Sequence, residues 1–221
     1  MNLNKHLEFI QPASYTKPIH IIGVGAVGSR VAEVLTRLGF DNLHIYDFDI
    51  VEDVNITNQL YDYEDLGQKK THALEKHLRK INPSLVLSLY EAYETQPLSG
   101  AVFLCVDSIT LRRKIAEDNQ MNVDIDAMFD IRMRLTDGQA YFADWNNYDH
   151  IKAFLGSMQF TDAEDMTPVS VCGTTLSVAP IILTLVSSTI MNFIAFIKKT
   201  ETRQAVYLDL MQFSLQAYNF N

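Results

Sequence analysis

The segment IIGVGAVGSRVAEVLTRLGFDNLHIYDFD, residues 21–49, decides the fold expected for this chain. It starts inside an apolar run that reads as a strand and passes through a turn with three glycines. Apolar residues at helical spacing follow over 26–38, and a second strand over 42–49 ends in two aspartates. The order strand, glycine turn, helix and strand predicts an α/β fold, with a Rossmann-like, doubly wound and mainly parallel sheet.

The remaining sequence continues this alternation as far as about residue 130. We expect helices over 65–83, 108–121 and 176–197, and strands over 85–90, 101–107, 122–129, 205–211 and 214–220. A hairpin over 132–145 is expected to turn at Asp137-Gly138, and residues 146–174 read as a mostly irregular connection. The closing strands predict an antiparallel extension of the sheet, and residues 1–221 are expected to form a single domain.

Composition and charge exclude several classes of protein. The chain has 221 residues, 48% of them hydrophobic and 20% charged, which is typical of a soluble globular protein. The formal net charge of −9 leaves no broad basic surface, so we expect no nucleic-acid partner.

The chain has two cysteines, Cys105 and Cys172, and no CxxC pair. This excludes a disulfide framework and a four-cysteine zinc site, so we expect no zinc. The first residues, MNLNKHLEFIQ, lack the apolar stretch of a secretory signal. Together these features favour the reducing cytoplasm as the location.

The longest apolar stretch of the chain, residues 176–197, contains no charge. By length it could span a bilayer, but it contains Pro180, Asn192 and five Ser or Thr residues, and strands of the same domain follow it. A helix that is apolar on every side also suits a protein core or a dimer interface. We therefore expect a buried helix and no membrane span.

The glycine turn predicts a nucleotide site. Gly23 and Gly25 let the backbone approach a phosphate, and Gly28 permits close packing of the helix on the strand. The helix N-terminus, which begins with Ala26 and Val27, presents free N–H groups to an anion. These residues alone do not distinguish NAD from ATP, and a turn required only for packing is the alternative.

An acid after the second strand usually accepts the ribose hydroxyls, and Asp47 is in this position. More acids follow it, starting with Asp49. Glu52 and Asp53 also fit a solvated loop without a ligand.

Six short motifs in a fixed order resemble the family of adenylating proteins that includes ThiF, MoeB, HesA and the ubiquitin-activating enzymes. They are GVGAVGS (23–29), DFDIVEDVN (47–55), Gln59 with Tyr61, DLGQKK (65–70), INP (81–83) and CVDSITLRRKI (105–115). The later CGTTLSVAPII (172–182) is similar to the family's entry into its last long helix.

This resemblance implies ATP as the nucleotide and the adenylation of a carboxylate as the reaction. The acceptor would be the C-terminus of a ubiquitin-like or sulfur-carrier protein or another carboxylate, and the protein would be a homodimer. By position in the motifs, Lys70 would stabilise the charge on the phosphates, with Lys69 as a possible substitute, and Asp107 would hold Mg²⁺. The nucleotide site would consist of Gly23, Gly25, Ala26, Val27, Gly28, Asp47, Asp49, Asn55, Asn58, Gln59, Lys70 and Asp107.

Alternatives exist for three of these side chains. Lys69 or Lys70 could be an ordinary helix-surface lysine. Asp107 could cap the helix that begins at Ser108, and this role can coexist with a role at the nucleotide.

The chain departs from the family pattern in its arginines. Asn58 stands where the family has an arginine at the γ-phosphate, and an amide brings no positive charge. No arginine occurs in the first 29 residues, although many members reach a partner subunit's ATP with one from the N-terminal arm. Four arginines are available as substitutes: Arg112, Arg113, Arg132 and Arg134.

The two cysteines have different predictions. Cys105 falls within an apolar strand and is expected in the core. Cys172 follows the irregular connection and is a possible nucleophile for a thioester, although an inert buried thiol is the more usual state.

Three hypotheses remain at this point. The first is an ATP-dependent activating enzyme with Lys70 and Asp107 as catalytic residues. The second is a non-catalytic relative that binds nucleotide or a partner. The third, an NAD-dependent oxidoreductase, depends only on the glycine turn and Asp47.

Overall fold

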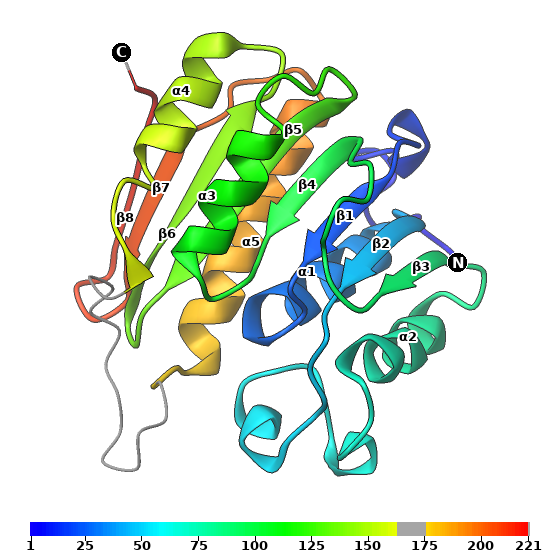
Figure 1. Ribbon diagram of the computed structural model, residues 1–221. Helices are drawn as coiled ribbons and strands as arrows, with labels where there is room; N and C mark the ends of the chain where they lie inside the picture. The colour runs from blue at the N-terminus through cyan, green and yellow to red at the C-terminus, as the bar shows by residue number, and fades with distance from the viewer. Residues whose placement is uncertain (163–175, 221) are drawn as a thin grey trace.

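The computed structural model describes residues 1–162 and 176–220, which form an α/β fold around one sheet (Figure 1). Within these residues the sheet has eight strands in the order β3-β2-β1-β4-β5-β6-β7-β8. The strands are β1 (Ile19–Ile22), β2 (Asn42–Tyr46), β3 (Val86–Tyr90), β4 (Gly100–Leu104), β5 (Ile125–Met133), β6 (Asp137–Asp144), β7 (Ala205–Asp209) and β8 (Ser214–Tyr218). Pairing is parallel from β3 to β5 and antiparallel from β5 to β8, which confirms the predicted fold class.

Helices cover both faces of the sheet (Figure 1). One face is packed by α1 (Ala26–Leu38), α2 (Lys70–Ile81) and α5 (Ala179–Ile197), and the other by α3 (Ile109–Asp118) and α4 (Tyr148–Gly156). Short 3₁₀ helices η1 (Pro12–Ser14), η2 (Asp53–Thr57) and η3 (Tyr63–Asp65) lie in the connections. The N-terminal ends of α1 and α3 therefore meet the same edge of the sheet, where the parallel strands end.

Helix α5 is the one helix in the described part of the chain that is long and apolar enough to cross a membrane. In this fold it packs against α1, β5 and β6. Its Phe193 is fully buried and meets the rings of Phe103 and Phe129 edge to face, with centroids 5.5 and 5.7 Å apart. One side of α5 thus belongs to the main hydrophobic core, as predicted for a buried helix, while its other side, with Leu183 and Met191, is exposed.

Helix α2 is shorter than the helix predicted over 65–83. Gly67 adopts a left-handed φ of +77°, and the segment around it bonds to the chain after β2: Gly67 N donates to Val51 O, and Val51 N donates to Gln68 O, each at 2.9 Å. The helix therefore begins only at Lys70.

The predicted turn at Asp137-Gly138 was wrong. Both residues lie in β6, and the turn between β5 and β6 comprises residues 134–136. A Cβ on Gly138 would lie 2.4 Å from Leu185 Cδ1. This glycine therefore serves the close approach of α5 to the sheet, which an Asp-Gly pair does not reveal in a sequence.

The prediction of an irregular connection over 146–174 was wrong for its first part, which contains α4. Asn147 caps this helix by accepting from Asp149 N at 3.0 Å and His150 N at 3.3 Å, and Ile151 and Phe154 are buried on one side. Residues 163–175 lie outside the described residues.

Candidate functional site

The glycine turn connects β1 to α1, and its three glycines serve different purposes. Gly23 has a φ of +87°, and a Cβ there would lie 2.9 Å from the backbone of Cys105. A Cβ on Gly28 would lie 1.9 Å from Gly23 O, so this position needs glycine for packing, as predicted. At Gly25, the N-cap of α1, a Cβ would meet nothing closer than Gln59 Nε2 at 3.9 Å. Gly25 is thus not required by the packing of the protein, and it keeps the approach to the helix N-terminus open.

A cavity of about 770 Å³ opens above this turn, a volume typical of small-molecule sites. Every residue predicted for the nucleotide site except Gly28 lines it. The predicted residues in its wall are Gly23, Gly25, Ala26, Val27, Asp47, Asp49, Asn55, Asn58, Gln59, Lys70 and Asp107. The structure therefore brings the predicted set together, while the role of each residue stays a prediction.

Asp47 follows β2 and holds the glycine turn. Its Oδ2 accepts from Val24 N at 2.7 Å, and its Oδ1 accepts from Asp49 N at 2.9 Å. Burial raises the pKa of Asp47, although these two N–H groups and the nearby Lys70 act in the opposite direction. Each carboxylate oxygen has a lone pair left for a ribose hydroxyl.

Lys70 and Lys69 point to different places. Lys70 is buried at the start of α2, with its side chain 8% exposed, and its Nζ donates to Asp49 Oδ2 at 2.8 Å. Lys69 is half exposed and pairs with the exposed Glu91, which lies in the cavity wall. Of the two, Lys70 alone lines the cavity, so the structure favours Lys70 over Lys69, its possible substitute.

Two side-chain amides in the cavity wall have unpaired oxygens. Oδ1 of Asn58 and Oε1 of Gln59 are buried and find no partner in the described part of the chain. The Asn58 NH₂ group donates to Ser177 Oγ. Rotating this carboxamide by half a turn would let the Ser177 hydroxyl donate to Oδ1 and would turn the NH₂ toward the unpaired position. Such a pair of buried amides suits an oxygen-rich ligand.

Asn55 has a structural role that sequence reasoning missed. Its Oδ1 accepts from Glu52 N at 2.9 Å, while the Glu52 side chain accepts from Asn55 N, which closes the start of η2. Because Asn55 also lines the cavity, this cap positions the loop that forms one wall.

Asp107 follows β4 and does not cap α3. The N-cap is Ser108, whose Oγ accepts from Leu111 N at 3.2 Å. A second cap comes from Asp162, which accepts from Ile109 N at 2.6 Å and from Ser108 Oγ at 3.0 Å. Sequence reasoning missed Asp162, because no motif connects it to a helix that lies so far away along the chain. Asp107 is left exposed in the cavity, with no hydrogen bond or ion pair to any described residue.

Three of the four candidate arginines are engaged inside the protein. The fully buried Asp130 pairs with both Arg112 and Arg132. Arg113 donates to the carbonyl oxygens of Met158 and Phe160. Arg134 lines the cavity from the β5–β6 turn and is exposed, with no side-chain partner among the described residues.

The two cysteines remain different in kind. Cys105 lies one residue beyond β4, is half-buried against the core and lines the cavity, so it is at the edge of the core and not inside a strand as predicted. Burial raises the pKa of its thiol to about 12, which disfavours the reactive thiolate. Cys172 lies outside the described residues, so its predicted role as a nucleophile stays a prediction.

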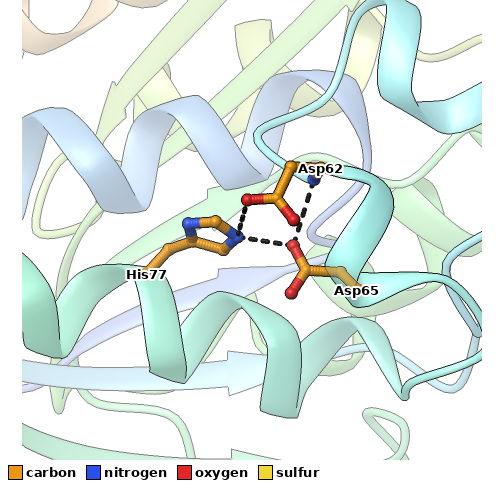
Figure 2. Close-up of side chains that lie close together, drawn as sticks. All are labelled: Asp62, Asp65 and His77. Atoms are coloured by element: carbon orange, nitrogen blue, oxygen red, sulfur yellow. Dashed lines mark hydrogen bonds and ion pairs between the residues drawn. The ribbon is translucent and has the colours of Figure 1, made fainter.

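Asp62, Asp65 and His77 form a second cluster, in which His77 comes from the second half of α2 (Figure 2). His77 Nε2 lies 2.5 Å from Asp65 Oδ2, which also accepts from Asp62 N at 3.1 Å, and Lys76 Nζ lies 3.3 Å from Asp65 Oδ1. Burial by itself raises the pKa of Asp65. The hydrogen bonds and charges of its partners together lower this pKa by more than burial raises it, so the net pKa lies below its ordinary value. With both Asp65 oxygens satisfied, the cluster is an anchor that ties η3 to α2.

The comparison with known proteins confirms the resemblance. The model of the ThiF family matches residues 13–220. The chain belongs to the ThiF family. Among curated proteins, ubiquitin-like modifier-activating enzyme 5 from Mus musculus is 40% identical over 75 residues, which cover 34% of this chain and 19% of that protein. The Arabidopsis thaliana protein of the same name is 40% identical over 72 residues, covering 33% and 17%. The matched part thus spans about a fifth of the length of these relatives.

Solved structures of ThiF-type proteins share the fold. Escherichia coli MccB with ATP superposes with a TM-score of 0.69 at 16% identity, covering 94% of this chain and 65% of that one. PaaA gives a TM-score of 0.73 at 15% identity, covering 98% and 68%. At these identities the likeness shows the ThiF-type fold, including the mixed sheet.

Proposed function

We propose that this protein binds ATP with Mg²⁺ in the cavity above the glycine turn and adenylates a carboxylate. The observation that carries the proposal is the buried ammonium of Lys70, which lines the same cavity as the N-terminal end of α1. A helix N-terminus and a lysine side chain together suit a phosphate chain. Family membership favours ATP over NAD, and the relatives' name supports the activation of a ubiquitin-like modifier.

The residues of the cavity fit this ligand in three ways. Gly25 leaves room for phosphate oxygens, the unpaired amides of Asn58 and Gln59 offer NH₂ groups after rotation, and Asp107 has a free carboxylate for a hard cation. Mg²⁺ bound there would supply positive charge to the triphosphate.

In the proposed reaction, a carboxylate oxygen forms a bond to the α-phosphorus, and the bond from phosphorus to the bridging oxygen breaks. Pyrophosphate leaves with that electron pair, and the product is an acyl-adenylate. Negative charge grows on the non-bridging oxygens during this step, so donors that already point at them lower the barrier. Lys70 and the N–H groups at the start of α1 provide this stabilisation, and Asp47 orients the ribose.

The acceptor would be the carboxyl end of a ubiquitin-like or sulfur-carrier protein, or of a peptide. Support comes from the name of the modifier-activating relatives and from structures that contain MccB together with MccA. A homodimer, with α5 and the neighbouring strands at its interface, is part of the same proposal.

The lysine pair offers a matched test. Lys70→Ala should lower the rate of ATP–pyrophosphate exchange with a competent carboxylate by about a hundredfold or more, because one donor to the developing charge is worth about 3–4 kcal/mol. Lys69→Ala is the control and should leave exchange within about twofold. Undiminished exchange in Lys70→Ala would refute the assigned role.

A non-catalytic relative is the second candidate. It is favoured by the shortage of free positive charge at the cavity. Asn58 brings no charge, and two of the three arginines in the cavity wall, Arg112 and Arg132, are paired with the buried Asp130. Calorimetry that detects Mg·ATP binding, together with no exchange for any carboxylate, would select this alternative.

A further inference from the structure

We propose that Arg134 is the residue that binds the acceptor carboxylate. This inference rests on the proposed function and names a subsite of the same cavity. It starts from the cations in the cavity wall, which are Lys70, Arg112, Arg132 and Arg134.

Only one of these cations is unpaired within the described residues. Lys70 is held by Asp49, and Arg112 and Arg132 share the buried Asp130. Arg134 contributes its backbone N–H to Asp137 O at 2.8 Å, but its guanidinium has no partner in residues 1–162 and 176–220. An exposed arginine that lines a cavity without a partner is available for an anionic ligand, and a guanidinium binds a carboxylate through two parallel hydrogen bonds.

The order of strands places Arg134 on the acceptor side of the nucleotide. At the edge where the parallel strands end, the order of residues is Asp47 after β2, the glycine turn after β1, Asp107 after β4 and Arg134 after β5. Neighbouring strands are about 4.8 Å apart, so β5 ends roughly 10 Å from β1.

The side chains proposed to contact the phosphates beyond the glycine turn come from the other side, and Asn58 stands where the family has its γ-phosphate arginine. Asn55 and Asn58 lie in the chain between β2 and α2, and Lys70 is the first residue of α2. Because the attacking and leaving oxygens lie roughly in line across phosphorus, the acceptor has to enter from the side of β4 and β5. Arg134 lies there.

The surface beside Arg134 provides a path for the rest of the acceptor. A second hollow, of about 220 Å³, runs over β6, β7 and β8 and shares Asp137, Gly138 and Gln139 with the main cavity. Its other lining includes Tyr207 and Gln216, which lie opposite each other in the β7–β8 register. An extended chain with a free carboxyl end could lie along this polar strip and place its carboxylate at Arg134. We infer a peptide-like acceptor.

Arg134 would offset the repulsion between the acceptor and the triphosphate, which are both anionic. The covalent step is the one written above, and Arg134 neither gives nor takes a proton in it, because a guanidinium stays protonated in proteins. Removing Arg134 should therefore weaken acceptor binding and leave nucleotide binding intact.

The test uses two pools of fluorescein-labelled pentapeptides that end in glycine, one with a free carboxylate and one with a carboxamide. Fluorescence anisotropy measures their binding to protein loaded with Mg²⁺ and a non-hydrolysable ATP analogue. We expect wild-type protein to prefer the carboxylate pool, Arg134→Gln to lose at least tenfold in affinity for it, and Arg134→Lys to recover part of the loss. Arg37→Gln, an exposed arginine paired with Glu33 on α1, is the matched control and should behave as wild type.

Two results would overturn the inference: wild-type protein that binds both pools equally or neither of them, and Arg134→Gln protein that keeps the preference. Calorimetry with the ATP analogue separates this failure from that of the proposed function. If wild-type protein and Arg134→Gln bind the analogue with equal affinity, the proposed nucleotide site is supported independently of the peptide-binding result. If wild-type protein does not bind the analogue, the proposed function itself fails.

Discussion

At the scale of single residues, the site depends on which of two similar neighbours turns inward. Lys69 and Lys70 carry the same charge, yet one lies on the surface and the other beneath the cavity. Lys70 N also donates to Asp49 O at 2.9 Å, so both its backbone and its side chain are tied to one residue. A lysine held by a half-exposed carboxylate is in place before any ligand arrives, and a phosphate can share its remaining N–H groups.

The glycine turn allows a prediction that separates folding from binding. Gly25→Ala should lower the free energy of unfolding by about 1 kcal/mol or less, the usual cost at an N-cap, because its methyl group has room. The same methyl group would occupy the approach to the helix N-terminus, so affinity for Mg·ATP should fall about tenfold or more, equivalent to about 1.4 kcal/mol. Urea unfolding and calorimetry measure the two quantities.

Gly28→Ala is the contrasting variant. Its methyl group would overlap Gly23 O, and the backbone shift should cost about 1–3 kcal/mol of stability. If Gly25→Ala bound Mg·ATP as tightly as wild type, the phosphates would not pass over this residue.

At the scale of elements, α2 and the loop before it act as one unit. The loop reaches α2 through the cluster of Asp65 and His77 (Figure 2). It reaches the chain after β2 through the hydrogen bonds around Val51. The hydrogen bonds around Val51, with that of Lys70 N to Asp49 O, hold the chain just before α2, which begins at Lys70. The second cluster thus supports the site from outside the cavity.

This anchor should make stability depend on pH in a defined window. The folded pKa of Asp65 lies below its value in the unfolded chain, about 3.9. The ionised carboxylate therefore contributes stability that is fully present well above pH 4 and is lost as the pH falls through the lower, folded pKa. Asp65→Asn removes this contribution. Urea unfolding should show a larger difference between wild type and Asp65→Asn at pH 7 than at pH 3.

Asp118→Asn is the matched control for this experiment. Asp118 is half exposed and, among the described residues, pairs only with Lys114, so its replacement should have a small effect at either pH. A difference for Asp65→Asn that stayed constant from pH 7 to pH 3 would mean that Asp65 does not titrate as the cluster requires.

At the scale of the whole molecule, the sheet has two unequal halves. The parallel half carries the cavity at the edge where its strands end, and the antiparallel half ends in β8, an edge strand with exposed apolar side chains. Leu215 on β8 lies opposite Leu208 of the main core and is 56% exposed, and on α5 Leu183 and Met191 are 46% and 52% exposed. These side chains lie on the same face of the sheet. A second copy of the chain would cover them.

The dimer proposal leads to a test in solution. Met191→Lys should convert a dimer into a monomer at micromolar concentration, because a buried, unpaired ammonium is costly at an apolar interface. Sedimentation velocity measures the change. Met121→Lys is the matched control, since Met121 is 84% exposed beyond α3 and should leave the dimer intact. A wild-type protein that sediments as a monomer would contradict the proposal.

Much of the fold was predictable from local patterns. Over residues 18–130 each strand and each helix has its own hydrophobic pattern, which can be recognised without knowledge of the rest of the chain. The parallel half of the sheet was therefore predicted correctly. The failures came where a contact between distant residues decides the local structure. The Asp137-Gly138 pair predicted a turn, but Gly138 allows α5 to approach the sheet closely. The start of α4 depends on the side-chain cap from Asn147, which could not be recognised among the polar residues around it.

The sequence by itself determined the kind of site: a glycine turn, the acids that follow the strands and a lysine in a family motif, because each of these is a local pattern. Only the tertiary structure decided which charges are free. Asp130, distant from Arg112 in the sequence, engages it together with Arg132. Ser108 and Asp162 cap α3 in place of Asp107, and Arg134 is left unpaired among the described residues. The reason is physical: pairing between charges depends on distance in space, and the fold sets those distances.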